Sequence, residues 1–356
     1  MMLISAAAAV ISMFLVPPSA EYLTYVDFRV IALLFCMMAV TSGLREIGTF
    51  EVLSRYFLKK GKDVRRISII LVLLCFFIAM AVTNDVALLT MVPFSLAVLD
   101  FAGEKRIIFV IVMETIAANL GSMLTPVGNP QNLYLFSYFG IDAVEFMKIT
   151  FPITGISLII IVSVISLVKG RKVDISFKDE VRITDKRRFA VYMLMFVLCI
   201  ITVFGVIDYR INFAIAIAGI FVTDRKIFAK IDYELLVTFI CFFIFVGNVS
   251  SIERVGVILA KVLEGHVLLF GAALSQIISN VPAAVMLSPF TNDAEELILG
   301  VDIGGLGTLV ASLASLISYK FYAGRKEAKK GLYLASFSVA NFGLLAVLLA
   351  LESYAF

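Results

Sequence analysis

Long apolar runs recur along the whole chain and are separated only by short polar segments. The runs are 13 to 20 residues long, and 61% of the 356 residues are hydrophobic, whereas a soluble domain is roughly half apolar. A helix of about 20 apolar residues spans the hydrocarbon core of a bilayer. The strands of an outer-membrane barrel would instead alternate apolar and polar residues. The sequence therefore predicts an all-α polytopic membrane protein with lipid around it.

Nine segments are predicted to cross the bilayer, and two further apolar stretches are predicted to turn back within it. The crossings are residues 2–16, 28–44, 106–136, 150–168, 188–206, 211–223, 234–247, 296–319 and 331–350. The stretches 67–100 and 266–290 are each split by a polar tip into two arms of about 15 residues, each shorter than a hydrocarbon core of about 30 Å. We therefore expect two re-entrant hairpins, each of which enters and leaves on the same side.

Basic residues gather in one set of loops, which predicts the topology. Of the 30 Lys and Arg residues, 25 lie in the segments 45–66, 101–106, 169–188, 224–230 and 320–330. Loops rich in Lys and Arg stay in the cytoplasm. We therefore expect a protein of the inner (plasma) membrane with a cytoplasmic N-terminus, a cytoplasmic linker at 169–187 and an external C-terminus. The segment 45–66 is predicted to be an amphipathic arm on the cytoplasmic surface.

The second half of the chain repeats motifs of the first half in the same order. VTNDVALLTMVPF (82–94) matches ISNVPAAVMLSPF (278–290) at an offset of 196, and NLGSMLTPVG (119–128) matches DIGGLGTLVA (302–311) at an offset of 183. The segment that starts at Asp27 matches the one that starts at Asp232, and five predicted crossings separate these two residues. Because five is odd, the second copy is inverted relative to the first.

The pattern predicts two inverted-topology repeats, residues 1–168 and 188–356. Each repeat has a re-entrant hairpin and a broken membrane helix, at 106–136 in the first and 296–319 in the second. Broken helices near the midplane of inverted repeats are typical of secondary transporters. A single proline or glycine in a membrane helix is usually only a kink, but four breaks that are paired by the repeat favour a transport site.

The four breaks offer ligands for cations and for anions. An ending helix presents free carbonyl groups, which suit a cation, and a beginning helix presents free N–H groups, which suit an anion. The breaks are the two hairpin tips and the segments LTPVGNPQN (124–132) and GGLGTLVAS (304–312). The candidate substrate-binding residues are Thr83, Asn84, Asn129, Asn132, Ser279, Asn280, Thr308 and Ser312. The first candidate cation site comprises Thr83, Asn84, Asp85, Thr125 and Gly128, and the second comprises Ser279, Asn280, Asp302, Gly304 and Thr308.

These motifs resemble those of the ion transporter superfamily, which groups divalent-anion sodium symporters and citrate transporters with arsenite permeases and sodium–proton antiporters. TNDVALLTMVPF is similar to the first hairpin tip of that superfamily, NLGSMLTPVGNPQN to the broken helix after it, and SNVPAAVML and DIGGLGTLVASLASL to their counterparts in the second repeat. The resemblance implies a scaffold bundle, a transport bundle that carries both hairpins, elevator-type alternating access and a homodimer.

One branch of the superfamily fits less well. The dicarboxylate symporters carry Ser-Asn-Thr at both tips, whereas this chain has Thr83-Asn84-Asp85 and Ser279-Asn280-Val281. A carboxylate at the first tip repels a divalent anion unless a proton or a metal ion intervenes. The second broken segment also lacks the Pro, Gly and Asn of the first, so the second cation site is less strongly indicated.

The predicted function is secondary active transport of a small anion or oxyacid, such as a carboxylate, coupled to sodium or protons by alternating access. The alternative is a proton-coupled arsenite or antimonite efflux permease, or a sodium–proton antiporter. No enzyme is expected, because the single histidine, His266, leaves no nucleophile–base pair. A channel would need a continuous polar pore. Beyond the coupling ion we expect no cofactor, and we expect no nucleic-acid partner. The four cysteines lie in apolar runs and are predicted to be buried.

Overall fold

The computed structural model describes residues 2–58, 63–167, 169–170, 182–183 and 185–355. Within these ranges the regular elements are all helices, as the apolar runs predict. Five of the described helices are long and apolar enough to cross a membrane alone, and the number is six if one bent pair counts as a single span. The five are α3 (Phe28–Glu46), α5 (Val64–Ala81), α9 (Ala143–Ser166), α12 (Tyr233–Ser250) and α18 (Lys330–Ala355). The chain is thus a polytopic helical membrane protein.

The remaining elements of the described residues are thirteen further helices and three 3-10 turns. The helices are α1 (Met2–Leu15), α2 (Tyr22–Tyr25), α4 (Thr49–Leu58), α6 (Asn84–Val98), α7 (Glu104–Ser122), α8 (Pro130–Phe139), α10 (Lys186–Val203), α11 (Tyr209–Thr223), α13 (Glu253–Leu263), α14 (Val267–Ile278), α15 (Asn280–Leu287), α16 (Ala294–Ile303) and α17 (Leu313–Ala323). The 3-10 turns are η1 (Asp100–Ala102), η2 (Arg225–Lys230) and η3 (Ser288–Phe290). The bent pair is α13 and α14, whose axes meet at 109°.

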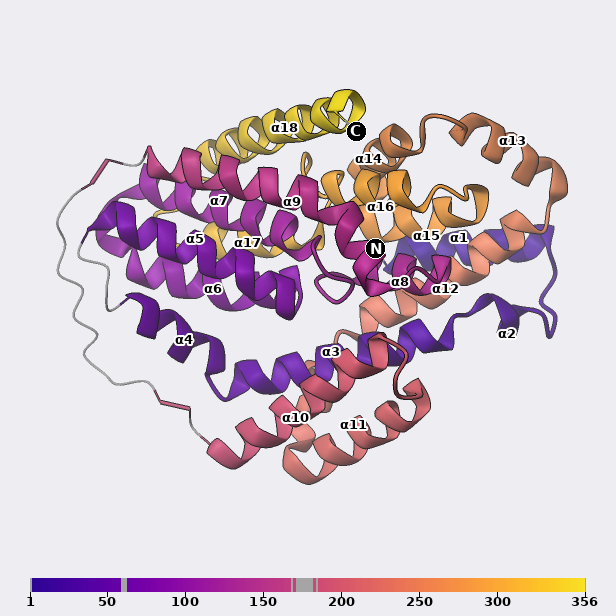
Figure 1. Ribbon diagram of the computed structural model, residues 1–356, viewed down its shortest axis with the longest axis horizontal. Helices are drawn as coiled ribbons and strands as arrows, with labels where there is room; N and C mark the ends of the chain where they lie inside the picture. The colour runs from indigo at the N-terminus through magenta and orange to yellow at the C-terminus, as the bar shows by residue number, and fades with distance from the viewer. Residues whose placement is uncertain (1, 59–62, 168, 171–181, 184, 356) are drawn as a thin grey trace.

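The helices pack as two groups (Figure 1). One group, called the hairpin bundle here, comprises α5–α9 and α14–α18. Within it α5 lies against α7, α14 against α16, α6 against α17, and α15 against α8. The other group, called the outer bundle, comprises α1, α3, α10, α11, α12 and η2, with α1 against α12 and α10 and α11 against α3. Segments far apart in sequence therefore meet in the hairpin bundle.

Each hairpin turns within one or two residues. Val82 and Thr83 separate α5 from α6, and Ser279 alone separates α14 from α15. The Thr83 side chain caps α6 by accepting a hydrogen bond from the Val86 N–H at 3.3 Å, which is the usual role of a hydroxyl residue at a helix start. Ser279 has a φ of 78°, a left-handed conformation that residues other than glycine rarely adopt. The polar tips are therefore the turning points, as the sequence indicates.

The first break is shorter than predicted. Residues 123–129 separate α7 from α8, whereas the sequence indicates a break over 124–132. The prediction was wrong for Pro130, Gln131 and Asn132, which form the first turn of α8. Proline is favoured in the first turn of a helix because the missing N–H has no partner there in any case. The second break occupies residues 304–312, between α16 and α17, as predicted.

Two other predictions about elements need comment. The span predicted at 150–168 begins earlier, because α9 starts at Ala143 behind the cap of Asp142 and continues through Pro152. The predicted arm at 45–66 contains the helix α4, and its residues 59–62 lie outside the described part of the chain. Most of the linker predicted at 169–187 also lies outside it.

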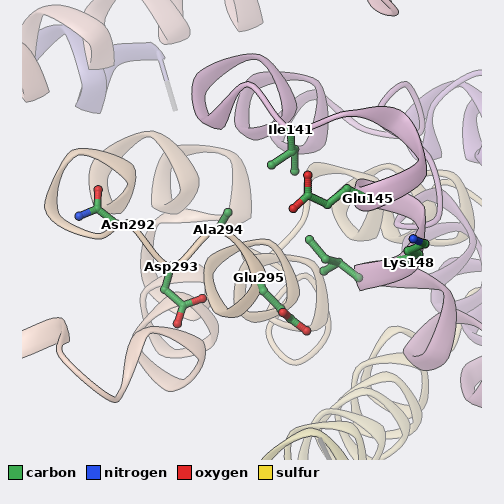
Figure 2. Close-up of a pocket in the computed structure, with 8 residues that line it drawn as sticks. Ile141, Glu145, Lys148, Asn292, Asp293, Ala294 and Glu295 are labelled. Carbon is green, nitrogen blue, oxygen red and sulfur yellow. The ribbon is translucent and has the colours of Figure 1, made fainter.

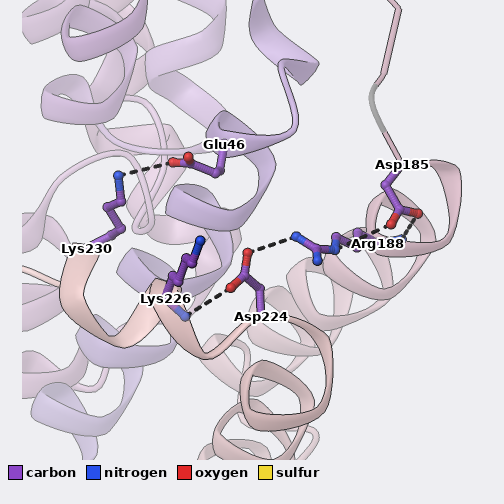
Figure 3. A network of polar contacts seen from close by, with 6 residues as sticks. All are labelled: Glu46, Asp185, Arg188, Asp224, Lys226 and Lys230. Carbon is purple, nitrogen blue, oxygen red and sulfur yellow. Dashed lines mark hydrogen bonds and ion pairs between the residues drawn. The ribbon is translucent and has the colours of Figure 1, made fainter.

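Ion pairs hold one end of the outer bundle together (Figure 3). Arg188 on α10 binds Asp224 at the end of α11, with 2.8 Å between Nη1 and Oδ2. Lys230 on η2 lies 3.3 Å from Glu46 at the end of α3. These pairs fix the ends of three helices next to the cavity described below. They are partly exposed, so each contributes little to stability.

Candidate functional site

A cavity of about 320 Å³ is lined by residues of both bundles. The hairpin bundle contributes Thr83 and Asp85 from the first tip, and Ser279 and Val281 from the second. Both predicted tips therefore reach one cavity, although they are almost 200 residues apart in sequence. The outer bundle contributes mainly apolar and polar residues of α3 and α12, together with charged residues at one end. We call this space the central cavity.

The first tip is tied to the first break by Asn84. Its backbone N–H donates to the carbonyl oxygen of Gly128 at 3.1 Å. Its side-chain Nδ2 donates to Oδ1 of Asn119 on α7 at 3.0 Å, and its Oδ1 accepts from the N–H of Asp85 at 2.9 Å. A Cβ at Gly128 would lie 2.0 Å from the carbonyl oxygen of Ser122. Only glycine therefore permits this close approach.

The second tip repeats two of these contacts, one with the second break and one within the tip. The N–H of Asn280 donates to the carbonyl oxygen of Ala311 at 2.9 Å, and its Oδ1 accepts from the N–H of Val281 at 3.0 Å. Ala311 aligns with Gly128 at the offset of 183. Both asparagines are almost completely buried.

A second pair of matching contacts involves threonine side chains. Thr125 Oγ1 donates to the carbonyl oxygen of Met80 at 2.6 Å. Thr308 Oγ1 donates to the carbonyl oxygen of Gln276 at 2.9 Å. In both halves a threonine of the break thus satisfies a free carbonyl near the end of the first hairpin arm.

The two breaks also contact each other. Ser312 donates from Oγ to Oδ1 of Asn119 at 3.0 Å. Asn129 donates from Nδ2 to Oδ1 of Asp302 at 3.2 Å. Asn129 aligns with Ser312, and Asn119 aligns with Asp302. The two hydrogen bonds therefore join equivalent pairs of positions in the two halves. Four helix ends are in this way linked through buried polar side chains.

Two carboxylates at this site have unsatisfied oxygens. Asp302 is 2% exposed, and its Oδ1 accepts from Asn129 and, at 3.1 Å, from Gln131 Nε2. Its Oδ2 is buried and makes no hydrogen bond. Asp85 lines the central cavity, and its Oδ1 is likewise buried without a partner. A buried, unpaired carboxylate costs free energy, which a bound proton or cation offsets.

Two predicted ligands of the second cation site bind another residue. The carbonyl oxygen of Gly304 accepts from Gln276 Nε2 at 2.8 Å, and the N–H of Thr308 donates to Gln276 Oε1 at 2.9 Å. Asn132 lies behind the first break, where its Nδ2 donates to the carbonyl oxygen of Met123 at 3.3 Å. Of the eight candidate substrate-binding residues, only Thr83 and Ser279 line the central cavity.

The residues that sequence reasoning missed are amides and cations. Asn119 and Gln131 lie inside the motif NLGSMLTPVGNPQN and could have been found there, since Asn119 aligns with Asp302. Arg45, Lys230 and Lys320 line the central cavity, although none of them belongs to a break. They come from three separate loop ends, so only the fold brings them together.

Among the described residues no group of three or more His, Cys, Asp or Glu side chains could hold a metal ion. The oxygen atoms around the tips and breaks are those of backbone carbonyl, hydroxyl and side-chain amide groups and of the carboxylates of Asp85 and Asp302. Such oxygen ligands replace the hydration shell of an alkali cation.

Other polar features lie apart from the central cavity. A surface pocket of about 630 Å³ is lined by Glu145 and Lys148 of α9 and by residues 292–295 at the start of α16 (Figure 2). Glu114 on α7 is completely buried and accepts a hydrogen bond from Ser95 Oγ on α6, so it joins two helices of the hairpin bundle. His266 precedes α14 and is exposed.

Comparisons with known proteins agree with this architecture. Residues 1–315 match the family described as citrate transporter. A protein of Methanocaldococcus jannaschii, named as an uncharacterized transporter, is 35% identical over 315 residues, which cover 85% of this chain and 84% of that protein. The inner membrane protein YbiR of Escherichia coli is 28% identical over 305 residues, which cover 85% of this chain and 82% of that protein. A rice protein (Oryza sativa) named silicon efflux transporter is 29% identical over 125 residues, 34% of this chain and 25% of that protein.

The helical fold and these relatives define a membrane transporter. The chain belongs to the citrate transporter family, and the resemblance of its motifs to the ion transporter superfamily is thereby confirmed. The family and the relatives from M. jannaschii and rice are named for transport.

Proposed function

We propose that this protein is a secondary active transporter of the inner membrane that moves a small anion or oxyacid, coupled to sodium or protons. The observation that carries the proposal is the convergence of both hairpin tips on one cavity, with an unpaired carboxylate oxygen at the start of α6. A polar site at the ends of broken helices suits a small charged solute.

Two inverted repeats form the proposed framework. Their support is the recurrence of the contacts Asn84–Gly128 and Asn119–Ser312 as Asn280–Ala311 and Asp302–Asn129. The hairpin bundle would be the moving part and the outer bundle the scaffold, which also mediates a homodimer. In elevator-type alternating access, the hairpin bundle would carry the site across the bilayer.

The proposed cation site lies in the first half. Thr83, Asn84, Asp85, Thr125 and Gly128 surround the junction of the first tip and the first break. Asp85 supplies the one negative charge among them, and its Oδ1 has no partner within the protein. Binding of a sodium ion or a proton there would neutralise the tip before an anion approaches it.

Positive charge at the cavity end favours an anionic substrate. Arg45 comes from the outer bundle and Lys320 from the hairpin bundle, and both line the central cavity. Lys230 also lines it, but it is paired with Glu46. Asp85, Asp232 and Glu234 also line the cavity, so the lining as a whole is not positive, and an anion would rely on Arg45 and Lys320. If the basic loops face the cytoplasm, this end of the cavity lies on the cytoplasmic side.

Exchange of Lys320 for glutamine tests the anionic class. Lys320→Gln removes a cation from the cavity wall, so the apparent KM for an anionic substrate should rise severalfold and depend less on ionic strength. Lys326→Gln is the matched control, because Lys326 is exposed on the loop after α17 and does not line the cavity. An equal effect of both changes would contradict a role of Lys320 in the site.

A thermal-shift panel identifies the substrate class. Citrate, dicarboxylates, sulfate, phosphate, arsenite and silicic acid are each added to purified protein, with sodium or choline and at several pH values. A ligand at a hundredfold its dissociation constant adds about 2.7 kcal/mol of stability. We expect one acid to stabilise the protein, and more strongly with the coupling cation than without it. No stabilisation by any acid would contradict the proposal.

The alternative is a proton-coupled efflux permease for a neutral or weakly acidic oxyacid, such as arsenite or antimonite. Its support is the acid at the first tip and the similarity to the protein named silicon efflux transporter. A sodium–proton antiporter is a further alternative that uses the same acid. Stabilisation by uncharged arsenite or silicic acid, with none by carboxylates, would favour efflux of oxyacids, and stabilisation by sodium alone would favour the antiporter.

A further inference from the structure

One side-chain amide donates hydrogen bonds to carbonyl groups of the second break. Gln276 is near the end of α14, three residues before the tip. Its Nε2 lies 2.8 Å from the carbonyl oxygen of Gly304, 3.0 Å from that of Leu306 and 3.1 Å from that of Ala272. Three carbonyl oxygens thus converge on a single nitrogen, which has only two hydrogens to donate.

The second break is shaped around this amide. Gln276 Oε1 accepts from the N–H of Thr308 at 2.9 Å. Gly307 has a φ of 101°, and a Cβ on it would lie 2.1 Å from that same Oε1. A larger residue at 307 would therefore displace the amide. Both ends of the amide are satisfied, so its orientation is fixed by the loop.

The first half shares the threonine contact of the second half but has a methionine in place of the glutamine. Gln276 aligns with Met80 at the offset of 196, and Gly307 aligns with Leu124 at the offset of 183. The threonine contacts at these positions match, as described above. A methionine side chain carries no hydrogen-bond donor. The two halves therefore differ in the donor that the carbonyl groups of the break receive, since Met123, which aligns with Leu306, accepts from Asn132 Nδ2.

We propose that the Gln276 amide takes the place of a coupling cation in the second half, so that the transporter couples through the first cation site alone. This inference rests on the proposed function. Converging carbonyl oxygens are the ligands with which proteins strip the hydration shell from an alkali cation. The NH₂ group presents partial positive charge to the same oxygens and carries no net charge to bury. The set Ser279, Asn280, Asp302, Gly304 and Thr308 would then be the structural counterpart of the first cation site.

Removal of the amide should turn the second break into a cation site. Gln276→Ala leaves the carbonyl oxygens of Gly304 and Leu306 without donors, which destabilises the protein. We expect its melting temperature to fall by several degrees in choline chloride, and sodium or lithium chloride to recover more than half of that loss. Purified protein is melted at equal ionic strength in choline, potassium, sodium and lithium chloride.

A matched control separates this effect from a simple cavity. Leu274→Ala changes a residue of the same helix that is also half-buried, and its loss of stability should be equal in all four salts. If Gln276→Ala gives no folded protein, Gln276→Met, which introduces the residue of the first half at similar volume, is scored by the same criterion. The inference is overturned if the melting deficit of the Gln276 variant is the same in all four salts.

Because the readout is stability in the absence of substrate, the experiment decides the inference separately from the proposed function. A cation-dependent deficit supports the inference even if no acid in the thermal-shift panel binds. Conversely, a substrate can be confirmed while the melting deficit of the Gln276 variant is independent of the cation. The proposed function then stands, and the proposed role of the amide is refuted.

Discussion

The two hairpin tips differ in one residue that decides their charge. Asp85 follows Asn84 in the first tip, whereas Val281 follows Asn280 in the second. Both residues line the central cavity. Their neighbouring asparagines make the same backbone contacts, so the geometry is common to both tips and the charge is not. The first tip is thus the place where a coupling proton or cation would be bound.

Exchange of Asp85 for asparagine tests this role. Asp85→Asn keeps the size of the side chain and removes its charge, so it should abolish ion-driven accumulation of substrate while the protein remains folded. The measurement is uptake per folded molecule in proteoliposomes with an imposed ion gradient. Glu295→Gln is a suitable control, because Glu295 is also in the first turn of a helix but lies in the surface pocket. Unchanged ion dependence in Asp85→Asn would assign the coupling to another residue.

At the scale of elements, the first break depends on close approaches that only glycine permits. A Cβ at Gly121 would lie 2.3 Å from the carbonyl oxygen of Phe76, and one at Gly128 would lie 2.0 Å from that of Ser122. In both cases the obstacle is backbone, which cannot move aside as a flexible side chain would. The break therefore holds α5, α7 and the first tip in register.

Insertion of one methyl group at the break should be costly. Gly128→Ala should destabilise the protein by about 1–3 kcal/mol or more, since overpacking forces the backbone to shift. Gly155→Ala on α9 is the control, because a Cβ at position 155 meets nothing within 4 Å. Alanine is also favoured over glycine in a helix interior. The two variants are compared by thermal melting and by the yield of monodisperse protein. A Gly128→Ala protein as stable as Gly155→Ala would mean that the break is not closely packed.

The sequence was sufficient to locate the hairpin tips, because the motif of Asn84 recurs at Asn280 and the polar residues interrupt long apolar runs. It was not sufficient for the end of the first break. Proline usually interrupts a helix, but Pro130 occupies the first turn of α8. Gln276 was missed because a lone glutamine in an apolar arm has no local signature. Its role depends on the carbonyl groups of a loop about 30 residues further on. The roles of the predicted site residues stay predictions.

At the scale of the whole molecule, the proposed inversion depends on the membrane topology. Charge predicts that the segment 169–188 faces the cytoplasm and that the turn before α16 faces outside. Both locations offer exposed residues: Lys186 at the start of α10 and Asn292 in the surface pocket. Three native cysteines are buried and the fourth is half-buried, and all four are free.

Labelling of single cysteines tests the topology. Lys186→Cys and Asn292→Cys are made in a background in which Cys36, Cys75, Cys199 and Cys241 are replaced. In sealed vesicles of known orientation, an impermeant maleimide should reach these two cysteines from opposite sides. Labelling of both cysteines from the same side would contradict the predicted membrane crossings, on which the inverted orientation of the second repeat is based.

The central claim is that both tips act as one transport site, and Asn84 and Asn280 test it most directly. Each asparagine is buried and joins a tip to its break. Leucine has a similar volume, but its side chain neither donates nor accepts a hydrogen bond, so Asn84→Leu and Asn280→Leu should each remove the side-chain bonds at the tip while the backbone bond to the break remains possible. Buried groups left unpaired cost about 1–3 kcal/mol each, so some stability is lost as well.

The decisive measurement is substrate uptake per folded molecule in proteoliposomes with an imposed gradient of the coupling ion, using the acid identified by the thermal-shift panel. The wild-type protein should concentrate that acid above its external level, and an ionophore should abolish the accumulation. Asn84→Leu and Asn280→Leu should each reduce uptake to the level of empty liposomes, and the double variant should be no worse than either single one, because residues that act as a unit are not additive. Normal uptake per folded molecule in either single variant would contradict the account.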